Sequence, residues 1–231
     1  MLSISTRSCV KFFWRGADRA DELNRTVVDL IGQGNEFISD EQKQFRDTRR
    51  NAWIGEGVGH AMLAVTARRE TSCVDGRVCT LSAVHPSPTR QGLDAVNTYV
   101  RNGILAIGIS ESKTTHSEGS GLLGDAAKLF TLVDEGVYGP DLRNELAAFR
   151  RALPQDLAAQ VSDALWTTNR CYLPTIVHQE EFNHLNHRPS LAKLIPPIER
   201  RRVIIVRFQE FHKFFDNVAD AMRTAVGEIV I

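Results

Sequence analysis

The stretch GLDAVNTYVRNGILAIGISESK, residues 92–113, decides the fold predicted for this chain. Two runs rich in Val, Ile, Leu, Tyr and Thr flank the pair Asn102-Gly103. Asn-Gly is the preferred pair for a two-residue type I′ turn, because both positions need a positive φ. The stretch therefore predicts a β-hairpin in which Arg101 faces Ile104, so directly opposed residues have numbers that add up to 205.

Two acidic residues and a lysine meet at the far end of this predicted hairpin. The register places Asp94 across from Glu111, with Cβ atoms about 4.5–5.5 Å apart, and Lys113 projects from the same face. Opposed like charges destabilise a sheet unless a positive group lies between them. Carboxylate oxygens suit Mg²⁺ or Mn²⁺, and a nearby ammonium can position or help deprotonate a water, which favours metal-assisted phosphodiester hydrolysis. The alternative is a pair of solvated strand-end carboxylates with Lys113 as their salt-bridge partner.

The composition is that of an ordinary globular protein. Of 231 residues, 42% are hydrophobic and 24% are charged, and 28 Lys and Arg balance 28 Asp and Glu. This balance argues against a high-affinity DNA binder that acts alone, and it leaves room for a local basic patch or for a partner that delivers the substrate. No apolar run reaches the roughly 20 residues of a membrane span, so no membrane partner is expected. The cysteines are scattered, which indicates free thiols and a cytoplasmic location.

The pattern of apolar residues and helix breakers predicts an α/β protein with added helices. We expect a central mixed sheet flanked by helices, an N-terminal helical addition over residues 1–50 and one domain over 51–231. The charged segment 38–51 is expected to be an exposed helix or loop. Predicted helices cover 17–34, 53–70, 117–135, 140–153, 154–166 and 211–229, and predicted strands outside the hairpin cover 77–84, 171–178 and 202–208.

These residues resemble the motif of the PD-(D/E)xK nuclease superfamily. The resemblance rests on Gly92-Leu93-Asp94, on Glu111-Ser112-Lys113 at the end of the next strand, and on Glu56 in the preceding helix. In that superfamily a helical Glu, a strand Asp and a Glu-x-Lys surround an αβββαβ core, the restriction-endonuclease-like fold. Leu93 stands where the motif has Pro, which changes nothing chemical because that Pro is not a ligand.

The resemblance implies a role for each matching residue. Asp94, Glu111 and Glu56 are similar to the carboxylates that bind Mg²⁺, with Mn²⁺ as the alternative ion, and the Ser112 carbonyl is implied as a further ligand. Lys113 is similar to the residue that orients the attacking water. The implied activity is a Mg²⁺-dependent DNA endonuclease, with Glu56, Asp94, Glu111 and Lys113 as its catalytic residues.

The motif and the later strand 171–178 are also similar to the nuclease subunit of the Hachiman anti-phage defence system, over residues 50–225. This resemblance implies an effector of antiviral defence that acts on DNA together with a helicase. Two other hypotheses stay open. One is a catalytically inactive, nuclease-like subunit that binds a helicase or ATPase partner, and the other is a phosphodiesterase that acts on a small nucleotide. The chain has no Walker-type loop, so ATP-driven work is expected from a partner.

Other polar residues are weaker candidates. His116 and Lys128 follow the motif and could contact a phosphate, but a solvated surface position is the simpler interpretation of each. The run 200–202 suits either backbone phosphates or a charged strand edge that prevents strand addition. The three histidines of VHQEEFNHLNH, residues 177–187, lack the spacing of a metal pair on a helix.

Overall fold

A computed structural model describes residues 20–67, 73–74, 76–84, 92–117, 119, 121–180, 189–195 and 200–228. The chain falls into two compact units, each of which is described by itself. The smaller unit is Met1–Ile54 with Glu210–Ile231, and the larger is Gly55–Gln209. The division lies within helix α4 (Asn51–Thr66). The C-terminal helix groups with the N-terminal residues, whereas the sequence-based division at residue 50 placed it with the sheet.

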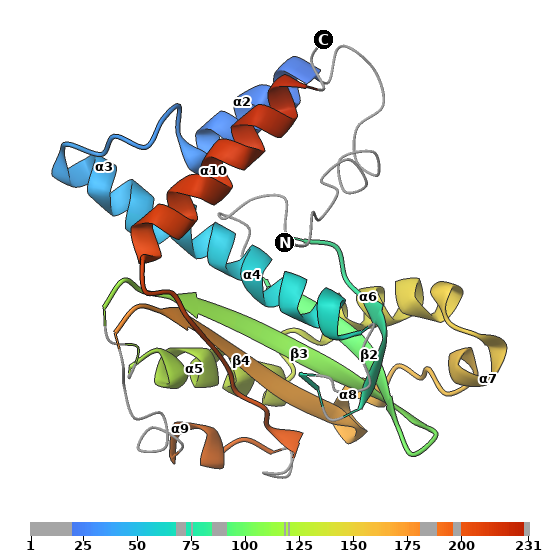
Figure 1. The fold of residues 1–231 in the computed structure, drawn as a ribbon. Helices are drawn as coiled ribbons and strands as arrows, with labels where there is room; N and C mark the ends of the chain where they lie inside the picture. The colour runs from blue at the N-terminus through green and yellow to red at the C-terminus, as the bar shows by residue number, and fades with distance from the viewer. Residues whose placement is uncertain are drawn as a thin grey trace. The chain divides into compact units, whose positions relative to one another are not determined.

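The larger unit is built around a five-stranded sheet in the order β1-β2-β3-β4-β5 (Figure 1). The pairs β1–β2 and β2–β3 are antiparallel, and the pairs β3–β4 and β4–β5 are parallel, so the predicted mixed sheet is confirmed. The strands are β1 (Arg77–Leu81), β2 (Ala95–Arg101), β3 (Ile104–Thr114), β4 (Arg170–His178) and β5 (Ile204–Arg207).

The β2–β3 hairpin has the predicted register. All seven pairs of its ladder have numbers that add up to 205. Asn102 and Gly103 have φ angles of 52° and 79°, the positive values that the turn requires. Because side chains alternate between faces along a strand, this register fixes which hairpin residues share a face.

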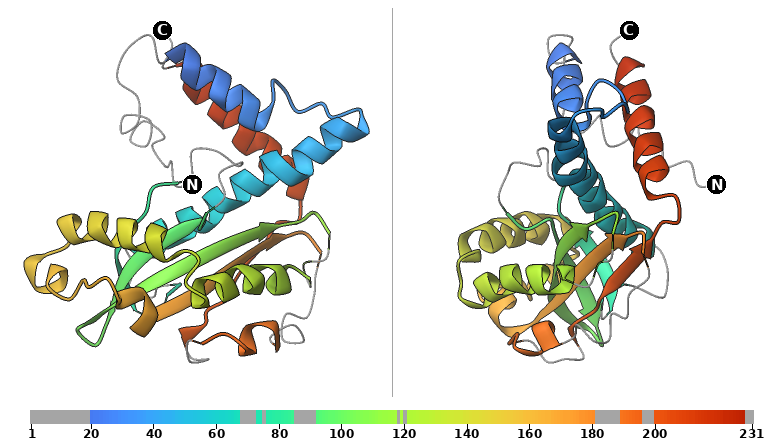
Figure 2. Two further views of the ribbon diagram at one scale, coloured as in Figure 1. Left: turned by 180° about the vertical axis from the view of Figure 1, so that it is seen from behind. Right: turned by 90° about the vertical axis from the view of Figure 1, so that its left-hand side faces the viewer.

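Helices cover both faces of the sheet. Leu105, Ile107 and Ile109 of β3 belong to a core cluster with α5 and α6, and Ala106 belongs to a second cluster with Leu63 of α4. Figure 2 shows α5 and α6 together on one side of the sheet. The helices of this unit, besides most of α4, are α5 (Leu122–Asp134), α6 (Gly139–Ala152), α7 (Gln155–Ala158), α8 (Leu165–Thr168) and α9 (Pro189–Ala192).

The segment 154–166 forms two short helices, α7 and α8, so the prediction of one helix was wrong. Between them, the Gln160 side chain bonds to the hairpin: its Nε2 donates to the Gly103 carbonyl at 3.2 Å, and its Oε1 accepts from the Leu105 N–H at 2.9 Å. Val161, Ser162 and Asp163 follow, and these residue types have low helix propensity. Contacts with the hairpin therefore outweigh a weak local preference for helix.

The smaller unit is helical. Its elements are α2 (Ala20–Ile31), α3 (Asp40–Phe45), the π-helix η2 (Arg46–Arg50), the start of α4 and α10 (Phe211–Gly227). The helices predicted over 17–34 and 211–229 are confirmed in the described residues, and 17–19 and 229 lie outside them. Helix α3 begins with a capping box, in which the Gln42 N–H donates to Ser39 Oγ at 3.2 Å and the Ser39 N–H donates to Gln42 Oε1 at 3.0 Å.

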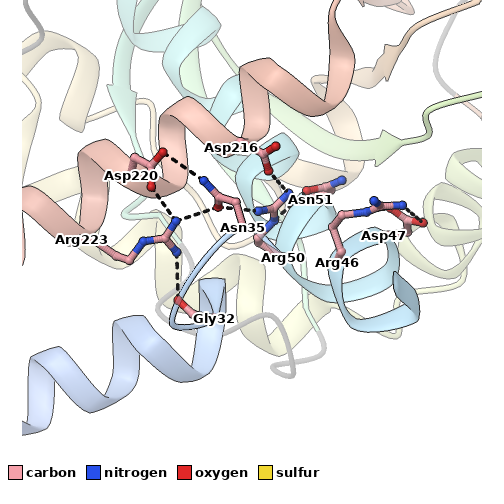
Figure 3. A network of polar contacts seen from close by, with 9 residues as sticks. All are labelled: Gly32, Asn35, Arg46, Asp47, Arg50, Asn51, Asp216, Asp220 and Arg223. Atoms are coloured by element: carbon pink, nitrogen blue, oxygen red, sulfur yellow. Dashed lines mark hydrogen bonds and ion pairs between the residues drawn. The ribbon is translucent and has the colours of Figure 1, made fainter. Parts of the chain in front are cut away.

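Arg50 is fully buried, so the expectation that 38–51 is exposed throughout was wrong. Its guanidinium donates to Asp216 at 2.8 Å and to Asn35 Oδ1 at 3.1 Å, and it lies 4.7 Å from the centroid of the Phe37 ring. Arg223 donates to the same Asn35 oxygen at 2.7 Å. This network, shown in Figure 3, ties helix α10 to the loop that follows α2. The prediction of exposure rested on the charges of the segment alone. The residue that pairs with the buried Arg50, Asp216, lies 166 positions later and could not be recognised from the segment.

Candidate active site

The hairpin brings Asp94, Glu111 and Lys113 together at the end away from its turn. Asp94 directly precedes β2, and its Oδ2 accepts a hydrogen bond from the Ser112 N–H at 2.6 Å. Lys113 Nζ donates to Glu111 Oε1 at 2.5 Å. Glu111 and Lys113 are two positions apart on β3, on the face that carries Ile109 into the core with α5 and α6.

Helix α4 brings Glu56 to the same place by a close approach to the sheet. A Cβ atom on Gly55 would lie 1.9 Å from Thr114 Oγ1, and one on Gly59 would lie 2.5 Å from Ser112 Oγ. The two glycines are about one helical turn apart, so they lie on the same side of α4. Because neither has a side chain, the helix backbone packs directly on the end of β3. Glu56 follows the first of these glycines, and the charges of Glu111 and Lys113 act on its carboxyl group.

The three carboxyl groups share one buried and acidic environment. Burial, and then the charge of Glu111, raise the pKa of Glu56 to about 7. Burial, and then the charge of Glu56, raise the pKa of Asp94 to about 7, although the hydrogen bond from Ser112 lowers it. Burial, and then the charge of Asp94, raise the pKa of Glu111 to about 7. The cluster therefore holds fewer than three negative charges near neutral pH unless a cation compensates them.

Lys113 is the cation within this cluster. Burial alone would lower the pKa of its ammonium group, but the charges of Glu111, Asp94 and Asp125 outweigh burial and raise the pKa above its usual value. Lys113 therefore stays charged at neutral pH. A charged ammonium can orient a water or a phosphate oxygen, whereas it cannot accept a proton, so the geometry favours orientation over general-base catalysis.

One oxygen of the cluster lacks a partner. Glu111 is 4% exposed, and its Oε2 is buried without a hydrogen-bond donor among the described residues. A buried carboxylate oxygen without a donor is costly, and a bound cation would satisfy it. Among the described residues, no three His, Cys, Asp or Glu side chains are placed to hold one metal ion together. Carboxylate oxygens are ligands that suit Mg²⁺, which often takes only one or two protein carboxylates and keeps several waters.

Two further residues border the cluster and were missed by sequence reasoning. Asp125, in the first turn of α5, acts through its charge on Lys113. Tyr138 precedes α6, and its hydroxyl has a raised pKa because of burial and then the charges of Glu111 and Asp141. No local pattern marks either residue, because both reach the cluster only through the packing of α5 and α6 on the sheet.

The weaker candidates lie elsewhere or have structural partners. Lys128 and His116 are exposed, and the Lys128 ammonium pairs with Asp125 at 2.7 Å. Arg200 and Arg201 donate hydrogen bonds to groups of their own unit. His178 is buried, with Nδ1 2.6 Å from a backbone carbonyl, and the other two histidines of 177–187 lie outside the described residues.

Comparisons with known proteins add no family to this description. No protein-family model, curated protein or solved structure matches the chain.

The described cysteines, Cys73, Cys79 and Cys171, are free thiols as predicted. In the ranges that the structure describes, no helix is both long enough and apolar enough to cross a membrane.

Proposed function

We propose that this chain is a metal-dependent nuclease of the PD-(D/E)xK type that hydrolyses phosphodiester bonds in DNA. The observation that carries the proposal is the hydrogen-bonded end of the hairpin with Asp94, Glu111 and Lys113, where the charges of Glu56 and the other two carboxyl groups act on one another and the described residues supply no donor to one buried Glu111 oxygen. Carboxyl groups whose pKa values are raised by burial and by one another are typical of functional sites. Apolar residues would fill the same space at lower cost, so a purely structural role explains the cluster poorly.

The order of the elements supports the proposed fold. Helix α4, strands β1, β2 and β3, helix α5 and strand β4 follow one another in the αβββαβ order of a restriction-endonuclease-like core, with α6, α7 and α8 inserted before β4. The first three strands are antiparallel and the fourth is parallel to the third. Glu56 lies in a helix and Glu111 and Lys113 lie in a strand, as the resemblance implies, and Asp94 directly precedes strand β2.

The metal ligands in this proposal are Asp94 and Glu111, with Glu56 and the Ser112 carbonyl in supporting positions. When bound, Mg²⁺ or Mn²⁺ polarises a phosphoryl oxygen and lowers the pKa of a bound water. Carboxyl groups must be ionised to bind a cation. Because burial and mutual repulsion raise the pKa values of all three to about 7, protons leave the cluster as the ion binds, and metal affinity is expected to rise with pH through that value.

The chain's own residues hold the reacting groups in place. Lys113 is fixed on Glu111 at 2.5 Å and stays charged, so it orients the attacking water and stabilises charge that develops on the phosphate. The Ser112 N–H holds the Asp94 carboxylate at 2.6 Å. Lys113 and Ser112 both belong to β3 in a hairpin with seven ladder pairs. Side chains on strands are positioned more firmly than side chains on loops.

We further propose that the nuclease acts with a helicase, as the resemblance to the Hachiman nuclease subunit implies. The chain has 28 basic and 28 acidic residues, so it has no overall positive field with which to collect DNA, and a partner that delivers the substrate would supply this. The rival hypothesis, an inactive nuclease-like subunit that binds the same kind of partner, requires neither the carboxylates nor Lys113.

Cleavage assays distinguish these hypotheses. The purified chain is incubated with supercoiled and linear DNA, alone and with co-expressed genomic neighbours, in Mg²⁺ and in EDTA. We expect Mg²⁺-dependent cleavage that is lost in Lys113→Ala and Glu111→Gln and kept in Lys128→Ala, the control for an exposed lysine of α5. Folded Lys113→Ala protein with full activity would refute the proposed mechanism. No cleavage under any condition, with both variants behaving as wild type in cells, would favour the inactive subunit.

A further inference from the structure

Three arginines line one flank of helix α6. Arg143, Arg150 and Arg151 are exposed, and within the described residues no hydrogen bond or ion pair joins any of their guanidinium groups to another side chain or to a backbone group. Arg150 is seven positions after Arg143, about two helical turns, and Arg151 lies about 100° further around the helix, so the three fall within an arc of about 100°. The opposite side of α6 is buried in the core through Leu142, Leu146 and Phe149.

The acidic residues of α6 lie on the other flank. Asp141 and Glu145 are each two positions from Arg143, and side chains two apart on a helix do not face each other. On the neighbouring helix α5, the exposed Lys128 is already paired with Asp125 at 2.7 Å. Within the part of the chain that the structure describes, no acidic side chain is therefore paired with the arginine flank.

Helix α6 begins beside the candidate active site. Tyr138 directly precedes it and packs, partly buried, against the core cluster that contains Leu93 and Ile109. Leu93 is next to Asp94 in sequence, and Ile109 is on the same face of β3 as Glu111. The charges of Glu111, Lys113 and Asp94 all act on the Tyr138 hydroxyl, which places the start of α6 close to the carboxylates. From there the helix packs on β2 and β1 (Figure 1).

We propose that the arginine flank of α6 binds the phosphate backbone of a polynucleotide whose scissile bond lies at the carboxylate cluster. The inference rests on the proposed function and deepens it, because it assigns the surface that holds the polynucleotide substrate. Guanidinium groups pair with phosphates through two parallel hydrogen bonds. Tyr138, which directly precedes α6, is the residue that links the start of the helix to the carboxylate cluster.

The dimensions fit several nucleotides. The eight positions from Arg143 to Arg151 correspond to about 12 Å along the helix axis. One strand of B-form DNA advances about 3.4 Å per phosphate, so the flank spans about three to four phosphates. An acidic protein would also be attracted to this flank, but the adjoining phosphodiesterase-type site favours a polynucleotide.

Counterion release gives the size of the expected effect. Each phosphate neutralised on a single strand contributes about −0.7 to the slope of log K against log salt. Removal of three arginines should therefore reduce the slope by about 2. A change of about 2 in this slope corresponds, at 0.1 M salt, to a loss of binding affinity on the order of 100-fold.

The test compares the full chain with Arg143→Gln/Arg150→Gln/Arg151→Gln. The control, Arg49→Gln/Lys193→Gln/Lys213→Gln, removes the same charge from exposed positions elsewhere. Binding of a fluorescent 20-nucleotide oligothymidine is measured in EDTA at several salt concentrations. Hydrolysis of bis(p-nitrophenyl) phosphate in Mg²⁺ reports on the carboxylate cluster without a polymer. We expect the α6 variant to lose about 100-fold in oligonucleotide affinity, with ester hydrolysis unchanged and the control variant equal to wild type.

The outcomes separate this inference from the proposed function. Oligonucleotide binding by the α6 variant that equals that of the control variant would overturn the inference, even if the chain cleaves DNA. Equal loss of affinity for polyglutamate would overturn it too, because the flank would then bind any polyanion. The chain could also show salt-dependent oligonucleotide binding that needs the α6 arginines and yet hydrolyse neither DNA nor bis(p-nitrophenyl) phosphate. This result would support binding by the arginine flank and count against the proposed nuclease activity.

Discussion

A single methyl group added to α4 tests how Glu56 is positioned. In Gly55→Ala the new Cβ would lie 1.9 Å from Thr114 Oγ1, 3.1 Å from Thr114 Cβ and 3.4 Å from its Cγ2. Rotation of the threonine cannot relieve the first contact, because its Cβ is also close. Either α4 or the end of β3 must move. Gly57→Ala is the matched control, since no atom of the described structure lies within 4 Å of its new Cβ.

The two variants share the same gain in helix propensity. Replacing Gly by Ala inside a helix stabilises it by about 0.5–1 kcal/mol, so Gly57→Ala should raise the free energy of unfolding by about that much. Overpacking costs about 1–3 kcal/mol, so Gly55→Ala should be less stable than Gly57→Ala by that amount. In Gly59→Ala the nearest atom is Ser112 Oγ at 2.5 Å, which can rotate away, so this variant should fall between the other two.

Urea denaturation of the three variants measures these differences, and DNA cleavage measures the consequence for the site. If Glu56 takes part in catalysis, a displacement of about 1 Å in α4 should lower the cleavage rate on the order of 100-fold in Gly55→Ala, with little change in Gly57→Ala. Equal stability and equal activity in Gly55→Ala and Gly57→Ala would refute the idea that close contact between α4 and β3 positions Glu56.

Three other predictions follow from charges. Because burial and repulsion raise the pKa of Glu111 from 4.5 to about 7, its contribution to stability is present below about pH 4.5 and is lost as the pH rises through about 7. At about 1.36 kcal/mol per pKa unit, this loss is about 3 kcal/mol, so urea denaturation in EDTA should show higher stability at pH 5 than at pH 8.5, with a smaller difference in Glu111→Gln. Addition of Mg²⁺ at pH 8.5 should raise the Tm of the wild type and leave that of Glu111→Gln unchanged, and no shift in the wild type would contradict a metal site. Arg50→Met should lower the free energy of unfolding by about 2–4 kcal/mol, because Asp216 loses the charged hydrogen bond from a fully buried guanidinium. Arg49→Met, at the exposed neighbouring position, should change the free energy of unfolding by under about 0.5 kcal/mol. Similar values for the two variants would contradict the role of the buried network.

The hairpin could be predicted because its information is local. Asn102-Gly103 specifies the turn, the turn specifies the register, and the register specifies that Asp94 and Glu111 share a face. The helix that carries Glu56 could be predicted from its apolar pattern. Its closeness to the carboxylates could be expected only from the resemblance, since nothing local in the sequence states which end of the sheet α4 crosses.

The features that escaped prediction depend on contacts between distant residues. Gln160 interrupts a helix because it bonds to the hairpin turn, more than 50 positions earlier in the chain. Arg50 is buried because Asp216, 166 positions later, supplies its partner. Tyr138 reaches the site only after α6 packs on the sheet. In each case the deciding interaction has no signature within the segment itself.

The register of the hairpin has a consequence for how such a chain can evolve. Asp94 is seven positions from the end of its strand at Arg101, about 24 Å from the turn at the usual rise per residue. One residue inserted at Asn102-Gly103 would shift the pairing and carry one of the two carboxylates to the opposite face of the sheet. The turn touches no substrate, yet its length decides whether the two acids meet. Changes of length should therefore be tolerated least at the place most remote from the chemistry, and substitutions there are limited to residues that accept a positive φ.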